Sequence, residues 1–180
     1  MLPRRLGAPG PDERQLQVIL EAAAAAPDHR RLLPWRFVLV PVDARERLAD
    51  VFAAALLERD AAATAQQQSE AREKAFRAPL LLLAISRTSG GDEDPEVTSL
   101  ERVVSAGCAI QNMLLTATAQ GYGSSLTSGK ALRSRALREL FALEAGEEAL
   151  CFVNVGTPTS ASRERQRPAV QAYVSKLPPR

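Results

Sequence analysis

Residues 99–120 read SLERVVSAGCAIQNMLLTATAQ, the most apolar helical stretch of the chain. Apolar side chains occupy nearly every side of this predicted helix, whereas a helix at a protein surface carries one apolar stripe. They are Val103, Val104, Ala106, Cys108, Ala109, Ile110, Met113, Leu114, Leu115, Ala117 and Ala119. Such a helix must be covered all round, and a chain of 180 residues can seldom do this alone. Homodimerisation is therefore a physical hypothesis for this protein.

Helical and strand-like segments alternate on the N-terminal side of this helix. Residues 12–26 have helical spacing, with Asp12 and Gln15 placed as a capping box and Pro27 at the end. A polar loop leads to a short strand at 37–40. Residues 44–77 predict two or three helical pieces, and the aliphatic run 80–85 predicts a central strand.

The remaining segments are shorter. The acidic, glycine-bearing stretch 87–97 predicts a surface loop, and 121–125 predicts a break after the apolar helix. Helical periodicity returns at 131–141, and 150–155 predicts a further buried strand. The tail from Ser160 is rich in arginine and predicts an extended arm with a few apolar residues to bury. We expect residues 1–180 to form a single domain.

Charge and composition exclude several classes of partner. Lys and Arg total 23 against 21 Asp and Glu, and this small excess does not indicate nucleic acid. Aromatic residues make up only 4%, too few for base-stacking platforms. The sequence has neither a long uncharged apolar run nor the apolar stretch of a signal peptide. We therefore expect a cytoplasmic protein without membrane association.

The residues that usually ligate metals are scarce. His29 is the single histidine, and zinc hydrolase sites usually need several. Cys108 and Cys151 each lie in an apolar run, which is typical of reduced core thiols rather than of a disulfide framework. No metal site is expected.

The segment GYGSSLTSGKA, residues 121–131, resembles a phosphate loop at first sight but fails on spacing. The Gly-x4-Gly-Lys-Ser/Thr pattern requires Gly where Ser124 lies and Ser or Thr where Ala131 lies. A dinucleotide fingerprint fails as well, because a third glycine is missing and a helix precedes the segment. Two interpretations stay open: a simple tight turn, or a segment whose backbone and the hydroxyls of Thr127 and Ser128 approach a flat ligand.

Other candidate residues also keep two interpretations. His29 is either a surface hydrogen-bonding residue or a functional one, but no G-x-S-x-G nucleophile elbow accompanies it. Trp35 is best interpreted as a core anchor at the start of a strand. Arg163, Arg165 and Arg167 alternate in the tail, so they form either a phosphate clamp or a solvated basic surface.

Taken together, four blocks of sequence resemble the nitroreductase family, in particular its short YdjA-type branch. They are LQVILEAAAAAPDHRRLLPWRFVLV (16–40), FRAPLLLLAIS (76–86), ERVVSAGCAIQNMLLTATAQGYGSSLTSGKAL (101–132) and FVNVGTP (152–158). The order APDH, PWRF, SAGCA-x-QNM and QGYG is far more specific than any single motif. The resemblance extends from about Arg5 to Val174.

The resemblance implies an α+β sandwich: a central mixed, mostly antiparallel sheet flanked by helices, with a long buried helix at a dimer interface and an extended C-terminal arm. It implies an interlocked homodimer with two FMN sites, each built from both chains. The flavin-contacting positions that it implies are His29, Leu126, Thr127, Ser128 and Gly129, with Arg5 and Arg167 as candidates for the phosphate. The stretch associated with NAD(P)H corresponds to Thr116, Ala117, Thr118, Ala119, Gln120 and Gly121.

The sequence also departs from the family pattern. Members normally carry an Arg-Arg-Ser triplet that grips the flavin phosphate, and this sequence starts after that position. Arg4 and Arg5 or the tail arginines could replace it, or the true start could lie upstream. Leu126 stands where the branch often has Trp, and Thr127 replaces a frequent Arg.

The function that the resemblance implies is hydride transfer from NAD(P)H through FMN to an electron-poor small molecule such as a nitro compound or quinone. Because the cofactor makes and breaks the bonds, no catalytic acid–base pair is expected. Two alternatives stay open: a flavin-free or flavin-sequestering dimer that retains the fold, and an oxygen-using enzyme that modifies flavin. The sequence leaves the acceptor and the choice between NADH and NADPH open.

Overall fold

A five-stranded antiparallel sheet forms the middle layer of the protein. The computed structural model describes residues 6–89, 96–159 and 166–177. The strands are β1 (Leu6–Gly7), β2 (Trp35–Leu39), β3 (Leu80–Arg87), β4 (Gly123–Thr127) and β5 (Glu147–Pro158). Their order is β1-β5-β3-β2, and β4 pairs with β5 as well. β1 and β4 follow one another along the edge of β5 that faces away from β3.

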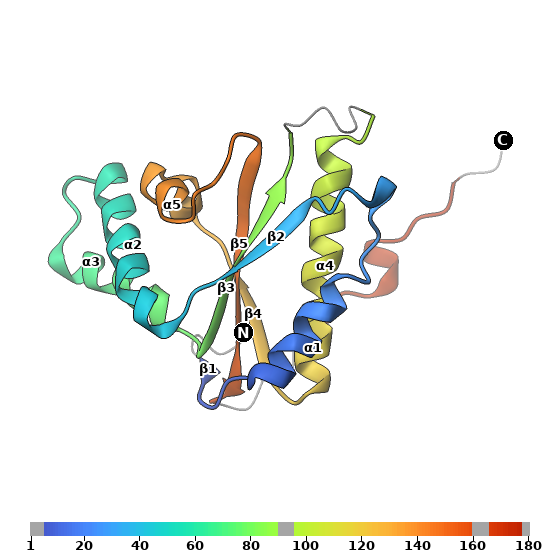
Figure 1. The fold of residues 1–180 in the computed structure, drawn as a ribbon, viewed down its shortest axis with the longest axis horizontal. Coiled ribbons are helices and arrows are strands. Elements are labelled where there is room, and N and C mark those ends of the chain that lie inside the picture. Colours follow the sequence, from blue (N-terminus) through green and yellow to red (C-terminus); the bar gives the residue numbers. More distant parts are fainter. Residues whose placement is uncertain (1–5, 90–95, 160–165, 178–180) are drawn as a thin grey trace.

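Helices cover both faces of this sheet. α1 and α4 lie on one side, and α2, α3 and α5 lie on the other (Figure 1). The helices are α1 (Glu13–Ala23), α2 (Arg45–Arg59), α3 (Ala65–Arg72), α4 (Ser99–Ala119) and α5 (Arg135–Leu140). The short 3-10 helices are η1 (His29–Arg31), η2 (Val42–Ala44), η3 (Glu73–Phe76), η4 (Lys130–Arg133) and η5 (Val170–Ala172). The predicted α+β sandwich is confirmed.

The strand β3 is central because it is apolar on both faces. Leu82 and Ala84 belong to the core cluster beneath α1 and α4, whereas Leu81, Leu83 and Ile85 belong to the cluster beneath α2 and α5. A strand in the interior of a sheet with helices on both faces buries every second residue on each side. The prediction of a central strand at 80–85 is therefore confirmed.

Two predicted boundaries were wrong around the apolar helix. Residues 121–125 were expected only to break the helix, yet 123–127 form β4. Small residues have little strand preference of their own, so pairing with β5 decides here. A Cβ at Gly123 would lie 2.8 Å from Leu6 Cδ2 and 3.0 Å from Pro158 Cγ, so a larger residue would displace these side chains. The helix predicted at 131–141 is divided at Ser134, whose extended backbone and hydroxyl cap α5.

At the N-terminal end, α1 begins as predicted, since Asp12 and Gln15 form a reciprocal capping box. The helix ends at Ala23 rather than at Ala26, because the residue before a proline is disfavoured in a helix. Trp35 is the first residue of β2 and is buried, as predicted. Cys151 is buried and its pKa is raised to about 11 by burial, which makes its thiol inert.

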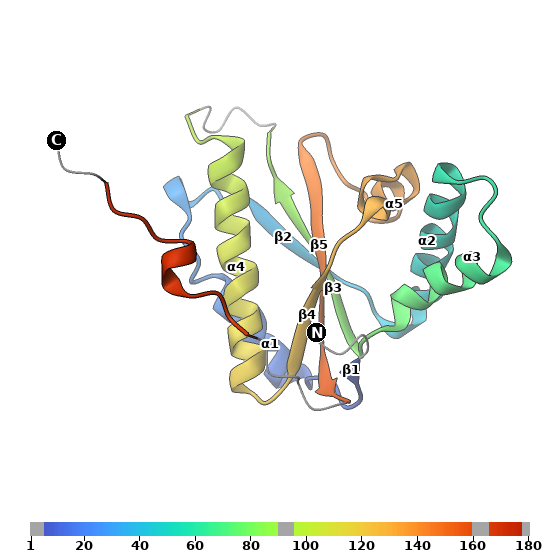
Figure 2. The same ribbon diagram turned by 180° about the vertical axis from the view of Figure 1, so that it is seen from behind.

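The helix α4 is not covered all round within one chain. Leu100, Val104 and Leu115 are 70%, 57% and 59% exposed. Cys108, expected in the core, is only partly buried. On the same side of the molecule, residues 166–177 project away from the body as an arm (Figure 2), and all of them are exposed. We name the exposed face of α4, with Leu100, Val104 and Leu115, the open face.

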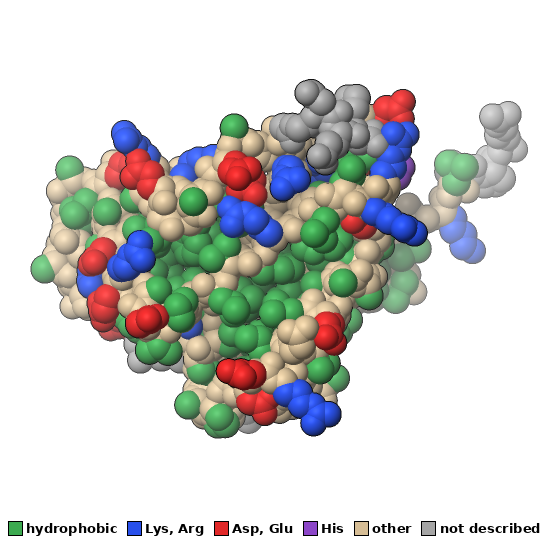
Figure 3. Space-filling model, in the orientation of Figure 1, with side chains coloured by type: hydrophobic (Ala, Val, Ile, Leu, Met, Phe, Trp, Pro, Cys, Tyr) green, Lys and Arg blue, Asp and Glu red, His purple; other side chains and the backbone are tan. Residues whose placement is uncertain are grey.

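Hydrophobic side chains also gather on the face drawn in Figure 3, over the middle of the molecule between α1 and α2. The edge strand β2 runs there, and its Leu39 is exposed. None of the helices that the structure describes has both the length and the apolar character of a membrane span.

An ion pair joins β2 to β5 across β3. Arg36 Nε and Nη2 donate to the two carboxylate oxygens of Glu147, both at 2.7 Å. The Glu147 side chain is only 4% exposed and also accepts from the backbone N–H of Glu144. These contacts lower the pKa of Glu147, mainly through the hydrogen bond from Arg36. The ionised carboxylate is therefore favoured in the folded state.

We expect Glu147→Gln to reduce the free energy of unfolding by about 1–3 kcal/mol at neutral pH, because a buried hydrogen-bonded ion pair loses one partner. The pKa of Glu147 is lowered by folding, so its contribution is present above the ordinary carboxyl pKa of 4.5 and is lost as the pH falls below it. Urea titrations between neutral and acidic pH would measure this. Glu148→Gln, at the exposed neighbouring position, is the control, and equal pH dependence in both variants would contradict the assignment.

Candidate functional site

The loop that carries His29 is fixed against the start of α4. Asp28 accepts from the backbone N–H groups of Leu32 and Leu33 at 3.0 and 2.8 Å. His29 Nδ1 lies 3.3 Å from Glu101 Oε1, and Glu101 also closes the capping box of α4. The pKa of Glu101 is lowered, first by the backbone hydrogen bond from Thr98 and then by its hydroxyl and His29.

The same loop has an unusual backbone. Arg30, Arg31 and Leu33 adopt φ angles of 58°, 55° and 46°. Residues other than glycine are uncommon in the left-handed region, and they concentrate at functional sites where the surrounding structure enforces them. The exposed side chains of His29 and Leu33 are thus presented outward by a constrained loop.

The segment that follows β4 forms part of a cavity on the opposite side of the molecule. Asn154 is buried in β5, and its Nδ2 donates to Thr127 Oγ1 at 3.1 Å. Beyond Thr127, Ser128 and Gly129 are exposed. The backbone at Gly129 is extended, and a Cβ there would meet nothing within 4 Å. Among the residues that the structure describes, none fills the space beside Gly129.

The cavity lies between α2, η3 and the link from β4 to η4 and has a volume of about 210 Å³. Its apolar wall comes mainly from Phe52, Leu56, Leu81 and Phe152. Four cationic side chains line it, and no carboxylate of the described residues does. The cations are Arg59, Lys74, Arg77 and Lys130. An apolar wall beside a cationic rim suits a flat ligand with negative charge at one edge.

Lys74 is the cation whose ionisation the cavity alters. Its pKa is lowered, mainly by burial and then by the charges of Arg77 and Arg59. Neither Lys74 nor Arg77 was among the residues predicted from the sequence. They are three residues apart just before the central strand, so a helical turn places both on one side. This spacing was the signal that the sequence offered. A perturbed lysine in a cavity indicates a functional site.

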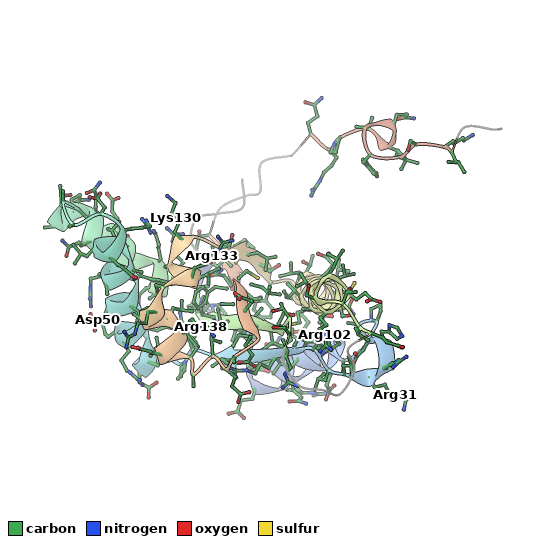
Figure 4. All side chains as sticks on the ribbon, turned by 90° about the horizontal axis from the view of Figure 1, so that it is seen from above. Arg31, Asp50, Arg102, Lys130, Arg133 and Arg138 are labelled. Atoms are coloured by element: carbon green, nitrogen blue, oxygen red, sulfur yellow. The ribbon has the colours of Figure 1, made fainter. Side chains whose placement is uncertain are left out.

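Within one chain, the predicted flavin contacts do not converge. Thr127, Ser128 and Gly129 line the cavity, whereas His29 does not, and Leu126 is 47% exposed. Figure 4 shows the separation: Arg31, from the His29 loop, lies beyond α4, and Lys130 lies on the side of α2 and α3.

The remaining predicted residues lie elsewhere. Arg5, Arg163 and Arg165 lie outside the described residues, and Arg167 is exposed at the start of the arm. Residues 116–119 form the C-terminal end of α4, and residues 120–121 follow it. This stretch lines neither this cavity nor the groove next to Lys130 and Arg133. Gln120 Nε2 instead donates to the carbonyl of Gln15 at 3.3 Å. The association of this stretch with NAD(P)H stays a prediction.

Comparison with known proteins decides the family. The sequence profile described as "Nitroreductase family" matches residues 4–157. The chain belongs to the nitroreductase family. It is 36% identical over 157 residues to the Escherichia coli K12 protein named "Putative NAD(P)H nitroreductase YdjA", which covers 86% of this chain and 81% of that protein. The expected YdjA-type branch is thereby confirmed, and the family is one of oxidoreductases.

Solved structures of nitroreductase-like proteins have the same fold. A nitroreductase-like family protein from Bacillus cereus superposes with a TM-score of 0.81 at 19% identity, covering 97% of this chain and 89% of that one. The FMN-dependent nitroreductase of Clostridium difficile R20291 has a TM-score of 0.63 at 19% identity, with 91% and 86% covered. At these identities the likeness establishes the fold alone. Among the described residues no cluster of His, Cys, Asp or Glu could hold a metal ion.

We expect the titration of Lys74 to report the charge of the cavity. Replacing Arg77 by Gln should raise the pKa of Lys74 toward the ordinary value of 10.5 without reaching it, because burial is the larger cause of its depression. The chain has only three lysines, at 74, 130 and 176, so their Nζ groups can be resolved by NMR. Arg135→Gln, at an exposed arginine that does not line the cavity, is the control. A Lys74 pKa unmoved by Arg77→Gln would exclude the cationic coupling.

Proposed function

We propose that this protein is an FMN-dependent oxidoreductase that accepts hydride from NAD(P)H and reduces an electron-poor small molecule such as a nitro compound or a quinone. The observation that carries the proposal is the cavity in which four cations and the backbone of Ser128 and Gly129 face an apolar wall. The printed names of the relatives, NAD(P)H nitroreductase and FMN-dependent nitroreductase, support the cofactor and the donor.

The residues present fit part of a flavin. The apolar wall suits the ring, and the open position at Gly129 leaves room for it to approach the backbone. The volume of about 210 Å³ is small, however, since ligand sites usually enclose about 300–1,000 Å³. We infer that one chain supplies only part of each site.

A second copy of the chain completes the site in this proposal. The open face of α4 and the arm, with Val170, Tyr173, Val174 and Leu177 exposed, provide the apolar surface for a homodimer. His29 cannot line the cavity of its own chain, so His29 of the partner subunit is the candidate contact. Arg167 lies at the start of the projecting arm, where it too could reach the partner's site.

Bound FMN supplies the hydride chemistry, and the protein supplies binding and electrostatics. Lys74 and Arg77 would stabilise negative charge at the N1–C2=O2 edge of the ring, as preorganised cations do where charge develops. Asn154 fixes the Thr127 hydroxyl through its 3.1 Å hydrogen bond, so this donor is oriented before a ligand binds. The apolar wall excludes water from the ring.

The direct experiment is a visible spectrum of the purified protein. We expect flavin absorption that NADPH or NADH bleaches under nitrogen. A colourless protein that does not bind added FMN would favour the alternative of a flavin-free dimer. Flavin breakdown in air would favour the flavin-modifying enzyme.

Two variants test where the contacts come from. Gly129→Val should abolish FMN binding without loss of stability, since its Cβ meets open space within the chain. His29→Ala should weaken FMN binding by about 0.5–1.5 kcal/mol, the contribution of one hydrogen bond. Mixing the two variants and allowing the subunits to exchange should create sites with wild-type affinity, about one quarter of the total.

This mixture distinguishes the arrangements because each mixed dimer contains one site with both contacts intact only if they come from different chains. Fluorescence titration of FMN measures the result. If no wild-type sites appear although mixed dimers form, both contacts belong to one chain. Wild-type affinity of His29→Ala before mixing would show that His29 makes no contact. Subunit exchange between wild-type copies, one of them tagged, is the control for mixing.

A further inference from the structure

Arg45 is a buried arginine whose partners are backbone carbonyls. It is the first residue of α2 and is 3% exposed. Its Nε donates to the Val40 carbonyl at 2.8 Å. Its Nη1 donates to Ala75 and Ala78 at 2.7 and 3.2 Å, and its Nη2 donates to Pro79 at 3.1 Å. No carboxylate of the described residues forms an ion pair with it.

This placement of Arg45 is unfavourable unless other interactions compensate for it. A cation at the first residue of a helix opposes the helix dipole, and a buried guanidinium loses hydration. Burial lowers the pKa of Arg45 for this reason. An apolar residue would fill the same space without either cost. Hydrogen bonds to four carbonyls offset this cost. Three of these carbonyls, those of Ala75, Ala78 and Pro79, lie near the end of η3 or just after it.

Two of those carbonyls belong to residues that adjoin cations of the cavity wall. Ala75 lies next to Lys74, and Ala78 lies next to Arg77. Both cations line the cavity, whereas Arg45 does not. The planar guanidinium therefore joins the end of β2, the turn at 75–78 and the start of β3 at one point. With the carbonyls of residues 75, 78 and 79 held by one side chain, the backbone that carries Lys74 and Arg77 has little freedom to move them away from the cavity.

We infer that Arg45 is a positioning residue, which orients Lys74 and Arg77 toward the flavin by holding the carbonyls of the turn that carries them. The inference rests on the proposed function. Arginine is required because its five donors have a fixed planar arrangement, whereas the ammonium of lysine is a point charge with three donors on a flexible chain. Lysine would keep the charge and lose the geometry.

The experiment compares Arg45→Lys with Arg36→Lys, which alters another arginine bonded to backbone carbonyls and lies away from the cavity. Thermal unfolding, FMN affinity and the Lys74 pKa by NMR are measured for both. We expect Arg45→Lys to weaken FMN binding at least about fivefold and to shift the Lys74 pKa, in line with losing one or two hydrogen bonds. Arg36→Lys should lower the melting temperature and leave both other quantities unchanged.

The outcomes separate the inference from the proposed function. If wild-type protein does not bind FMN, the proposed function fails. If wild-type protein binds FMN and Arg45→Lys affects affinity no more than Arg36→Lys does, a merely structural role is established and the inference is overturned.

A measurement on the wild-type protein covers the case in which the variants do not fold. FMN binding should slow hydrogen exchange at Arg45 Nε relative to Arg36 Nε, because the ligand stabilises the turn that Arg45 holds. Equal protection of the two groups would overturn the inference.

Discussion

The apolar surface of α4 is the constraint on which the structure depends. The helix packs one side on α1 and the sheet, yet Leu100, Val104 and Leu115 stay on its open face. Large exposed apolar surfaces on a folded chain mark interfaces. The exposed arm adds further apolar residues on the same side of the molecule (Figure 2). A second copy is the occupant that would cover both and would also complete a cavity that is too small for the proposed flavin.

The two ends of the proposed site depend on different layers of the fold. On one face of the sheet, α2 and η3 place Lys74 and Arg77 beside the end of β4. At the other end of the molecule, Asp28 and α4 hold the His29 loop in a left-handed backbone. A rigid sheet keeps both ends fixed within one chain but cannot bring them together. Only contact between chains would do so, which makes assembly and cofactor binding one event in this account.

Sequence patterns predicted the elements whose burial decides their structure. The aliphatic run at 80–85 and the apolar helix at 99–120 were evident because their periodicity reflects what covers them. The strand β4 was missed because Gly123, Ser124 and Ser125 have no strand preference, and only pairing with β5 makes them one. Strand pairing between distant segments cannot be predicted from a local sequence pattern.

The site was predicted only as far as the family resemblance reaches. It indicated His29 and residues 126–129 and a site built from two chains, and the separation of the two regions within one chain agrees with that expectation. Lys74 and Arg77 were missed because a charged residue near a helix end is usually solvated. Their proposed role rests on their position at the cavity, beside carbonyls that accept hydrogen bonds from Arg45, a residue remote in sequence.

Sedimentation velocity recorded in the visible flavin band tests the central claim most directly. Our account predicts that bound FMN sediments with a dimer, and that dilution or Leu115→Glu releases FMN and produces monomer together, because binding and assembly are linked. Leu57→Glu, an exposed leucine on α2 at the other side of the molecule, should leave both intact. Flavin that sediments tightly bound to a monomer would contradict the account.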